Sequence, residues 1–222
     1  MYYCTHCNKV FEPEAYVNFP KIDDQIVLCP IKGCRSQILD IDEAFIPIIR
    51  ELYCFDIKTL FCCSGHSWQL EDGTVDIYLV YDYEHMNEDG FLEIFTEQLK
   101  ELSEEDIYSF INVHIINEEK PRTYIDIDGN VHTTSTVVDV CVDMPSLKDC
   151  VTPLEEHSLL LLRQAEFVNA INTALKNSAA IVVKRQKLAI EIDTELDEAK
   201  ELDELLNGGG EFDMTNGGSE IF

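Results

Sequence analysis

Two stretches in the middle of the chain repeat apolar side chains at helical spacing. After Asp42, a candidate N-cap, residues 45–52 place apolar side chains three and four positions apart, and Pro47 lies close enough to the first turn to be tolerated. Residues 90–102 repeat this spacing with a wider apolar stripe. The pattern predicts a helix over each stretch. The apolar positions are Phe45, Ile48, Ile49 and Leu52 in the first, and Phe91, Leu92, Ile94, Phe95, Leu99 and Leu102 in the second.

Apolar and polar side chains alternate around these two helices, which is typical of half-buried strands. We expect strands at residues 57–62 and 74–83, with an Asp72-Gly73 turn before the second. Three further strands are expected at residues 111–116, 122–128 and 134–144. The order of elements predicts an open α/β sandwich with a mostly antiparallel sheet, which belongs to the α+β class.

The segment DIDGN, residues 126–130, alternates Asp126, Asp128 and Asn130 in the manner of a calcium loop. An EF-hand loop also requires glycine at its sixth position and glutamate at its twelfth, where this chain has Val131 and Val137. The segment therefore predicts a hairpin turn through Asp128-Gly129.

The best-marked helix start in the chain is a capping box. Thr152 stands at the N-cap, Pro153 at the first helical position and Glu155 at the third. A first helix follows, and after Asn177-Ser178 the apolar pattern resumes in a second helix with nearly heptad spacing. We expect the first helix to pack on the α/β domain, whereas the second either packs there or pairs with a second copy in a homodimer. The expected stripes are Leu161, Ala165, Val168, Ile171 and Leu175, then Leu188, Ile192, Leu196, Ala199, Leu202 and Leu206.

Four of the nine cysteines form two close pairs near the N-terminus. Two residues separate Cys4 from Cys7 and four separate Cys29 from Cys34, so each pair can offer both thiolates to one ion. The 21 residues between the pairs are enough for a hairpin that folds them together. Four thiolates leave no open coordination position, which predicts a structural Zn²⁺ in a zinc ribbon, whereas His6 is expected to face solvent. The alternative is chance spacing of reduced cysteines.

The charge is strongly acidic and unevenly distributed. Acidic residues number 43 and basic residues 16, for a net charge of -27, which disfavours broad contact with nucleic acid or anionic lipid. Residues 40–150 alone carry 25 acidic and 6 basic side chains. Such a surface suits a basic protein partner, divalent cations or mimicry of a polyanion, or it serves solubility alone.

Composition divides the chain into four parts. We expect a zinc ribbon at 1–39, an acidic α/β domain at 40–150, a helical region at 151–206 and a flexible acidic tail at 207–222. The first residues show no basic segment followed by an apolar stretch, and no apolar run approaches the roughly 18 residues of a membrane span. These features predict a cytoplasmic protein.

The segment FCCSGHSW, residues 61–68, gathers two cysteines, a Ser-Gly turn, a histidine and the single tryptophan at the end of a predicted strand. Cys63, Ser64 and His66 are the candidate catalytic or ligand-binding residues, because a nearby imidazole favours a thiolate and a serine hydroxyl can bind an anion. Trp68 would stack on a ring of the ligand. The alternative is a structural strand end, in which free cysteine serves as a small apolar side chain.

The string IIRELYCFDIKTLFCCSGH, residues 48–66, resembles a pattern of small uncharacterised proteins of phages and Gram-positive bacteria. It is more distantly similar to the Ser-Cys-Ser-Gly-Arg stretch of the tRNA wybutosine-synthesising protein 3 family. His66 stands where that family has arginine, and the acidic surroundings are unsuited to tRNA, so its methyltransferase activity is not expected here. The resemblance implies a phage-type accessory protein that acts on host machinery in the host cytoplasm.

These features favour a non-enzymatic interaction protein that binds a basic host protein through an acidic face. One alternative is a ligand-binding or catalytic domain centred on the CCSGH stretch and related to nucleotides or RNA. A second is an accessory factor of nucleic-acid replication, in which the neutral N-terminal segment contacts a strand. The basic residues of that segment are Lys9, Lys21, Lys32 and Arg35.

Overall fold

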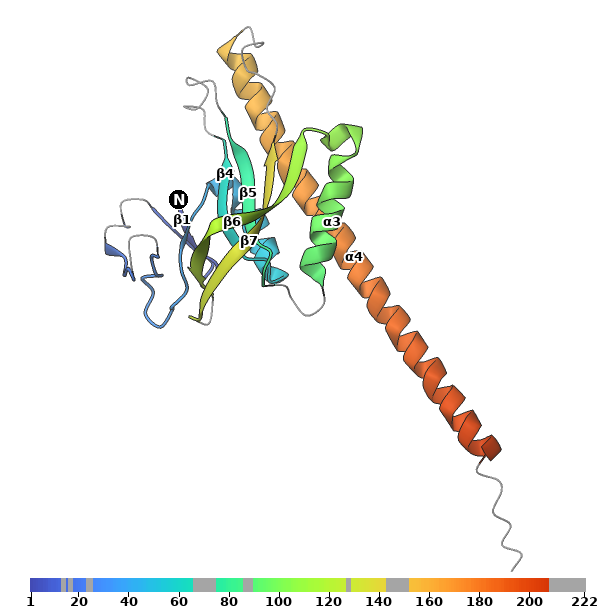
Figure 1. The fold of residues 1–222 in the computed structure, drawn as a ribbon. Helices are drawn as coiled ribbons and strands as arrows, with labels where there is room; N and C mark the ends of the chain where they lie inside the picture. Colours follow the sequence, from blue (N-terminus) through green and yellow to red (C-terminus); the bar gives the residue numbers. More distant parts are fainter. Residues whose placement is uncertain are drawn as a thin grey trace, which may run out of the picture. The chain divides into compact units, whose positions relative to one another are not determined.

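The computed structural model describes residues 1–12, 15, 18–22, 26–65, 75–85, 90–126, 129–142 and 152–207 (Figure 1). The chain divides into two compact units, Met1–Ala179 and Ala180–Phe222. The described part of the first unit combines two antiparallel sheets with helices. The expected α+β class is confirmed, with antiparallel sheets and a C-terminal helix.

A small three-stranded sheet brings together the two ends of the N-terminal segment, residues 1–39. Strand β1 (Tyr2–Cys4) is central and pairs antiparallel with both β2 (Lys9–Phe11) and β3 (Leu39–Asp40). Because β2 follows β1 closely and β3 ends the segment, this pairing closes the intervening chain into one loop.

The main sheet has four strands in the order β4-β5-β7-β6. All three pairings are antiparallel, so the prediction of a mostly antiparallel sheet is confirmed. The order leaves β4 and β6 as the two edge strands. The strands are β4 (Thr59–Ser64), β5 (Ile77–Asp82), β6 (Ile111–Ile125) and β7 (Val131–Val142).

The three strands expected after the second helix are in fact two, because β6 continues through the polar residues 117–121. These residues suggested a break, but β6 is an edge strand, where charged side chains face solvent. Pro121 is tolerated there because an edge strand needs no hydrogen bond from that side. A register shift between Asn117 and Arg122 accommodates the irregular segment.

A hairpin turn joins β6 to β7, as the segment DIDGN predicts. The Asp126 amide donates to the Asn130 carbonyl at 3.1 Å, and the Gly129 amide donates to the Asp126 carbonyl at 3.2 Å. Gly129 has φ +85°, a left-handed conformation that glycine adopts without steric cost. Residues 127 and 128 lie outside the described residues.

Both helices expected between residues 42 and 103 are present. A 3-10 turn, η2 (Glu43–Phe45), leads into α1 (Ile46–Cys54), with Pro47 in the first turn as expected. Helix α3 (Phe91–Ser103) is followed by η3 (Asp106–Tyr108). The prediction for Asp42 is wrong in one respect: it precedes η2, but its side chain makes no capping hydrogen bond there. Its carboxylate instead accepts from Ser64.

The C-terminal region is one helix, α4 (Pro153–Asn207), and not the two expected. Its capping box is confirmed, since the Thr152 amide donates to Glu155 Oε2 at 3.0 Å and the Glu155 amide to Thr152 Oγ1 at 3.3 Å. Ser178 does not break the helix, because its hydroxyl donates to the Ala174 carbonyl one turn earlier at 2.7 Å. Among the described residues, no helix has the length and apolarity needed to cross a membrane.

The predicted apolar stripe of α4 is correct at Ile171 and Leu175 but wrong at its start. Leu161 is 51% exposed, whereas Leu160 and Phe167 are buried. Because residues 159–162 are all leucine, the sequence does not show which side of the helix is buried. The Phe167 ring stacks on Phe45 of η2, with 5.5 Å between ring centroids, and this contact fixes the buried side. The buried residues of α4 are Leu160, Phe167, Ala170, Ile171, Ala174, Leu175 and Ser178.

The burial of Phe167 predicts that Phe167→Ala destabilises the protein by about 3–5 kcal/mol, because it leaves a cavity against Phe45. The matched variant Leu161→Ala is expected to change the free energy of unfolding by less than about 0.5 kcal/mol. Denaturant unfolding of both variants measures the difference. A larger effect for Leu161→Ala would show that the other face of the helix is packed.

Candidate metal centre

The structure brings the two cysteine pairs into one cluster. The sulfur atoms of Cys4, Cys7, Cys29 and Cys34 all lie within 4.8 Å of one another. Sγ of Cys4 is 3.7 Å from Sγ of Cys34, and Sγ of Cys29 is 3.9 Å from Sγ of Cys7. A disulfide would need about 2.05 Å. A tetrahedron of sulfurs about 2.3 Å from a central ion has edges of about 3.8 Å, so the cluster fits a four-coordinate metal.

Each pair is carried by a tight turn with one residue in the left-handed region. Cys4 ends β1, the Cys7 amide donates to Cys4 Sγ at 3.4 Å, and Asn8 then turns the chain with φ 52°. In the second pair, Gly33 has φ +90° directly before Cys34. These turns point both thiols of each pair to the same side.

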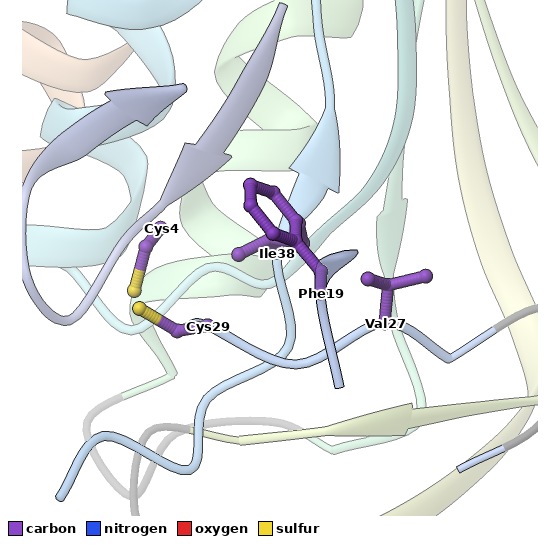
Figure 2. Packing of buried hydrophobic residues seen from close by; sticks show 5 residues of the cluster. All are labelled: Cys4, Phe19, Val27, Cys29 and Ile38. Carbon is purple, nitrogen blue, oxygen red and sulfur yellow. The ribbon is translucent and has the colours of Figure 1, made fainter. Parts of the chain in front are cut away.

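A small apolar cluster supports the four sulfurs (Figure 2). Phe19, Val27 and Ile38 are buried beside Cys4 and Cys29, whose sulfur atoms point toward each other. The rings of Tyr2 and Phe11 contact the Phe19 ring edge-on at centroid distances of 6.4 and 5.2 Å. With so few large apolar residues, a segment of this size depends on a further source of stability, which a metal ion would supply if the four sulfurs bound one.

Burial makes Cys4 and Cys29 poor acids when no cation is bound. It raises the pKa of Cys4, and it raises the pKa of Cys29 to about 11. Burial acts in the same direction on Cys34, but hydrogen bonds led by the Ser36 backbone amide outweigh it and lower the pKa of Cys34. At neutral pH the metal-free cluster therefore retains protons, and a metal ion would displace them on binding.

His6 lies outside this cluster. Its side chain is exposed, as expected, and it is not among the residues whose ligand atoms converge. The described residues that converge as candidate ligands are the four cysteines alone.

The described part of the CCSGH stretch is tied to two other elements. Ser64 ends β4, and its amide and hydroxyl donate to Asp42 Oδ2 at 2.6 and 3.0 Å. Gln164 of α4 donates through Nε2 to the carbonyls of Ser64 and Gly65 at 2.6 and 3.1 Å. The strand end is therefore fixed by hydrogen bonds to a carboxylate and an amide. His66 and Trp68 lie outside the described residues, so their placement stays a prediction.

Gly65 is required by packing at this strand end. Its φ is +78°, and a Cβ atom built there would lie 2.8 Å from side-chain atoms of Leu160 and Val75. Any larger residue would displace α4 or the start of β5.

The two cysteines of this stretch are not activated by their surroundings. Burial raises the pKa of Cys63 and raises that of Cys62 to about 12, so both are neutral thiols at physiological pH. Ser64 donates its hydroxyl proton to a carboxylate that also holds its amide. The described residues thus have the hydrogen bonding and burial of a structural strand end.

A polar network that no sequence motif indicates surrounds Asp82, at the end of β5. The Asp82 carboxylate is 1% exposed and accepts from Tyr124 Oη at 2.7 Å and from the Glu84 amide at 2.9 Å, and its Oδ2 lies 2.8 Å from His85 Nδ1. His132 pairs directly across the strands with Tyr124 and stacks on its ring. No local motif signals this group, because it depends on the register of β6 against β7.

These contacts change the acidity of Asp82. Burial acts to raise its pKa, but hydrogen bonds from Thr134, Tyr124 and the Glu84 amide outweigh burial and hold the pKa below its ordinary value of 3.8. The carboxylate is therefore charged at neutral pH, and its hydrogen bonds to hydroxyl groups connect β5 with β6 and β7.

The chain was compared with models of known protein families, with curated proteins and with solved structures, and none of the three comparisons finds a match. The residues themselves therefore carry the functional proposal.

The sulfur cluster predicts about one bound metal ion per chain in protein purified without chelator, measured by elemental analysis. Cys29→Ser should lose the metal and lower the unfolding temperature, because three thiolates and a hydroxyl bind a thiophilic ion more weakly. Cys54→Ser, at an exposed free cysteine, is the matched control and should retain the ion. Metal-free protein of unchanged stability would contradict the assignment.

Asp82→Asn should lower the free energy of unfolding at pH 7 by about 2 kcal/mol, because hydroxyl donors then face an uncharged amide. The folded-state pKa lies below the unfolded value, so the stabilisation is present above about pH 3.8 and is lost as pH falls through the folded pKa. Urea unfolding at several pH values should therefore show a smaller acid-induced loss in the variant. An equal loss would exclude Asp82 as its source.

Proposed function

We propose that the protein is a non-enzymatic, zinc-containing interaction protein that binds a basic protein surface through an acidic face. The observation that carries this proposal is the four-thiol cluster, which leaves no coordination position open for a substrate. The neutral thiols of Cys62 and Cys63 in β4 add to it, because they supply no activated nucleophile.

The metal is proposed to be Zn²⁺ and the N-terminal segment a zinc ribbon. Four sulfur ligands at tetrahedral spacing favour zinc over the hard cations, which prefer oxygen. The ribbon is supported by the two cysteine-bearing turns and by the antiparallel pairing of β1 with β2 and β3. In this proposal the zinc is structural and holds the segment folded.

The acidic face is proposed to lie on α3 and the turn after it. Exposed carboxylates recur four residues apart at Glu93, Glu97 and Glu101, a spacing at which like charges destabilise a helix by about 0.2–0.5 kcal/mol per pair. Only Lys100, 3.5 Å from Glu97, offsets this repulsion in α3. We define the α3 acidic face as Glu93, Glu97, Glu101, Glu104, Glu105 and Asp106.

Ile107 gives this face an apolar contact point. Its side chain is 65% exposed and directly follows the carboxylates of the turn. A basic surface with a shallow apolar depression would be complementary to this combination. The carboxylates would mainly increase the rate of encounter and fix the orientation of the partner.

One observation favours a second candidate, the nucleic-acid accessory factor. The four basic side chains Lys9, Lys21, Lys32 and Arg35 are all exposed on the N-terminal segment. Four cations neutralise few phosphates, so affinity for a single strand would be low and steeply dependent on salt. Unchanged mobility of a single-stranded oligonucleotide at low salt would exclude this candidate.

The proposal is tested by capturing a partner from bacterial lysate and measuring its affinity for variants. Neutralising Glu93, Glu97 and Glu101 to glutamine should weaken binding by about tenfold or more, because several favourable charge contacts are lost. The matched control neutralises three exposed acids elsewhere, Glu43→Gln, Glu51→Gln and Asp76→Asn, and should weaken binding less than about threefold.

Salt provides a second measurement on the same complex. Raising the salt concentration from about 0.05 to 0.2 M should weaken binding severalfold, because surface charges are then screened within about 10 Å. Affinity that is indifferent to salt, or equal losses in both triple variants, would contradict binding through the α3 acidic face.

A further inference from the structure

A cavity of about 850 Å³ lies between the N-terminal segment and the two edge strands of the main sheet. Its volume falls within the range of roughly 300–1,000 Å³ that is typical of small-molecule sites. Its lining includes Thr5, which lies between Cys4 and Cys7, but it includes none of the four cysteines and not Ser64. Its aromatic, basic and hydroxyl-bearing lining residues include Tyr53, Lys58, Thr59, Phe61, Lys120, Arg122 and Tyr124.

The cavity exists because the main sheet curves until its edges approach each other. Two strands separate β4 from β6, yet the Arg122 guanidinium of β6 lies 4.3 Å from the centroid of the Phe61 ring on β4. The N-terminal segment forms another wall, where Gln37 Oε1 accepts a hydrogen bond from the Ile125 amide at 3.0 Å. The walls are thus fixed by contacts between three separate parts of the fold.

One wall carries a buried polar atom without a partner. Thr59 is 2% exposed, and its Oγ1 has no hydrogen-bond partner among the described residues. A buried hydroxyl left unsatisfied costs about 1–3 kcal/mol, and Thr59 is one of the residues that line the cavity, so a bound molecule that reached this oxygen would remove that cost.

Basic side chains are concentrated around this cavity. Of the six basic residues at positions 40–150, three line it, namely Lys58, Lys120 and Arg122. Lys58 lies 5.2 Å from the centroid of the Tyr53 ring and forms an ion pair with Asp56, so a cation and an aromatic ring adjoin in the same wall. Lys120 has no ion-pair partner among the described residues and is exposed.

Two of the three carboxylates that line the cavity, Glu118 and Asp126, already have hydrogen-bond partners. Glu118 is held by both nitrogen donors of Arg122. Asp126 binds the His132 ring and the Asn130 side chain, each within 3.1 Å. Glu119 is exposed. Lys120 therefore remains a cation of this wall without an ion-pair partner among the described residues, while Glu118 holds Arg122 with its guanidinium carbon over the Phe61 ring.

We propose that this cavity binds a nucleotide, with the ring stacked among Arg122, Phe61 and Tyr53 and the phosphate near Lys120 and Lys58. Thr59 Oγ1 forms a hydrogen bond to the bound molecule. Aromatic rings and a guanidinium plane stack on any base, and ammonium groups bind phosphate as point charges. This site is independent of the α3 acidic face, and it holds whether or not that face binds a protein.

Isothermal titration calorimetry of the full chain with the four ribonucleoside 5′-monophosphates tests the proposal. At least one should bind with Kd below about 1 mM, and its nucleoside and inorganic phosphate should each bind about tenfold more weakly, because each lacks one of the two recognised groups. Failure of all four monophosphates to bind, or equal binding of nucleoside or phosphate, would overturn it.

Thr59→Val is the sharpest variant, because it keeps the shape of the side chain and removes only the hydroxyl. It should weaken nucleotide binding about 3- to 10-fold and leave the unfolding temperature of the free protein unchanged or higher. Lys120→Gln should weaken binding of the monophosphate but not of its nucleoside, and Lys100→Gln on α3 is the matched control. A lower unfolding temperature for Thr59→Val, or unchanged nucleotide affinity in both cavity variants, would refute the site.

Discussion

Four thiols whose sulfur atoms all lie within 4.8 Å of one another set the main constraint on this structure. Burial raises the pKa of Cys4 and Cys29, so these two thiols resist ionisation unless a cation compensates the charge. The turns that carry the thiols are continuous with β1 and with the loop that leads to β3. That loop also supplies Gln37, which binds the edge of β6. Order in the N-terminal segment therefore extends to a wall of the cavity.

Local signals in the sequence were reliable for features that depend on residues only a few positions apart. The capping box at Thr152 and the close cysteine pairs each depend on residues a few positions apart, and the structure contains both the cap and the cluster. The apolar stripe of α4 and the continuation of β6 through residues 117–121 were mispredicted. Each depends on a part of the fold that is distant in the sequence. Phe45 selects the buried face of α4, and the position of β6 at the sheet edge permits its polar segment.

The candidate sites also divide into those that have a local signal in the sequence and those that depend on the fold. Spacing alone identified the four cysteines, whereas Asp82 and Thr59 become notable only when strand register and curvature are known. The Ser64 strand end stood out in the sequence for its composition. Its described hydrogen bonds to Asp42 and Gln164 show how an unusual local composition can serve packing. The roles proposed for the metal and for the cavity are linked through the N-terminal segment, whereas the role proposed for the acidic face depends on a different set of side chains.

The edge strand β6 has a consequence for behaviour at high protein concentration. An open edge of fifteen residues is a template on which other chains can add strands and form insoluble assemblies. Here the exposed stretch carries Glu119, Lys120 and Pro121 within an irregular register, and each of these interrupts regular pairing with an incoming strand. The polar interruption that made β6 hard to recognise in the sequence thus also protects the folded protein against self-association through its sheet.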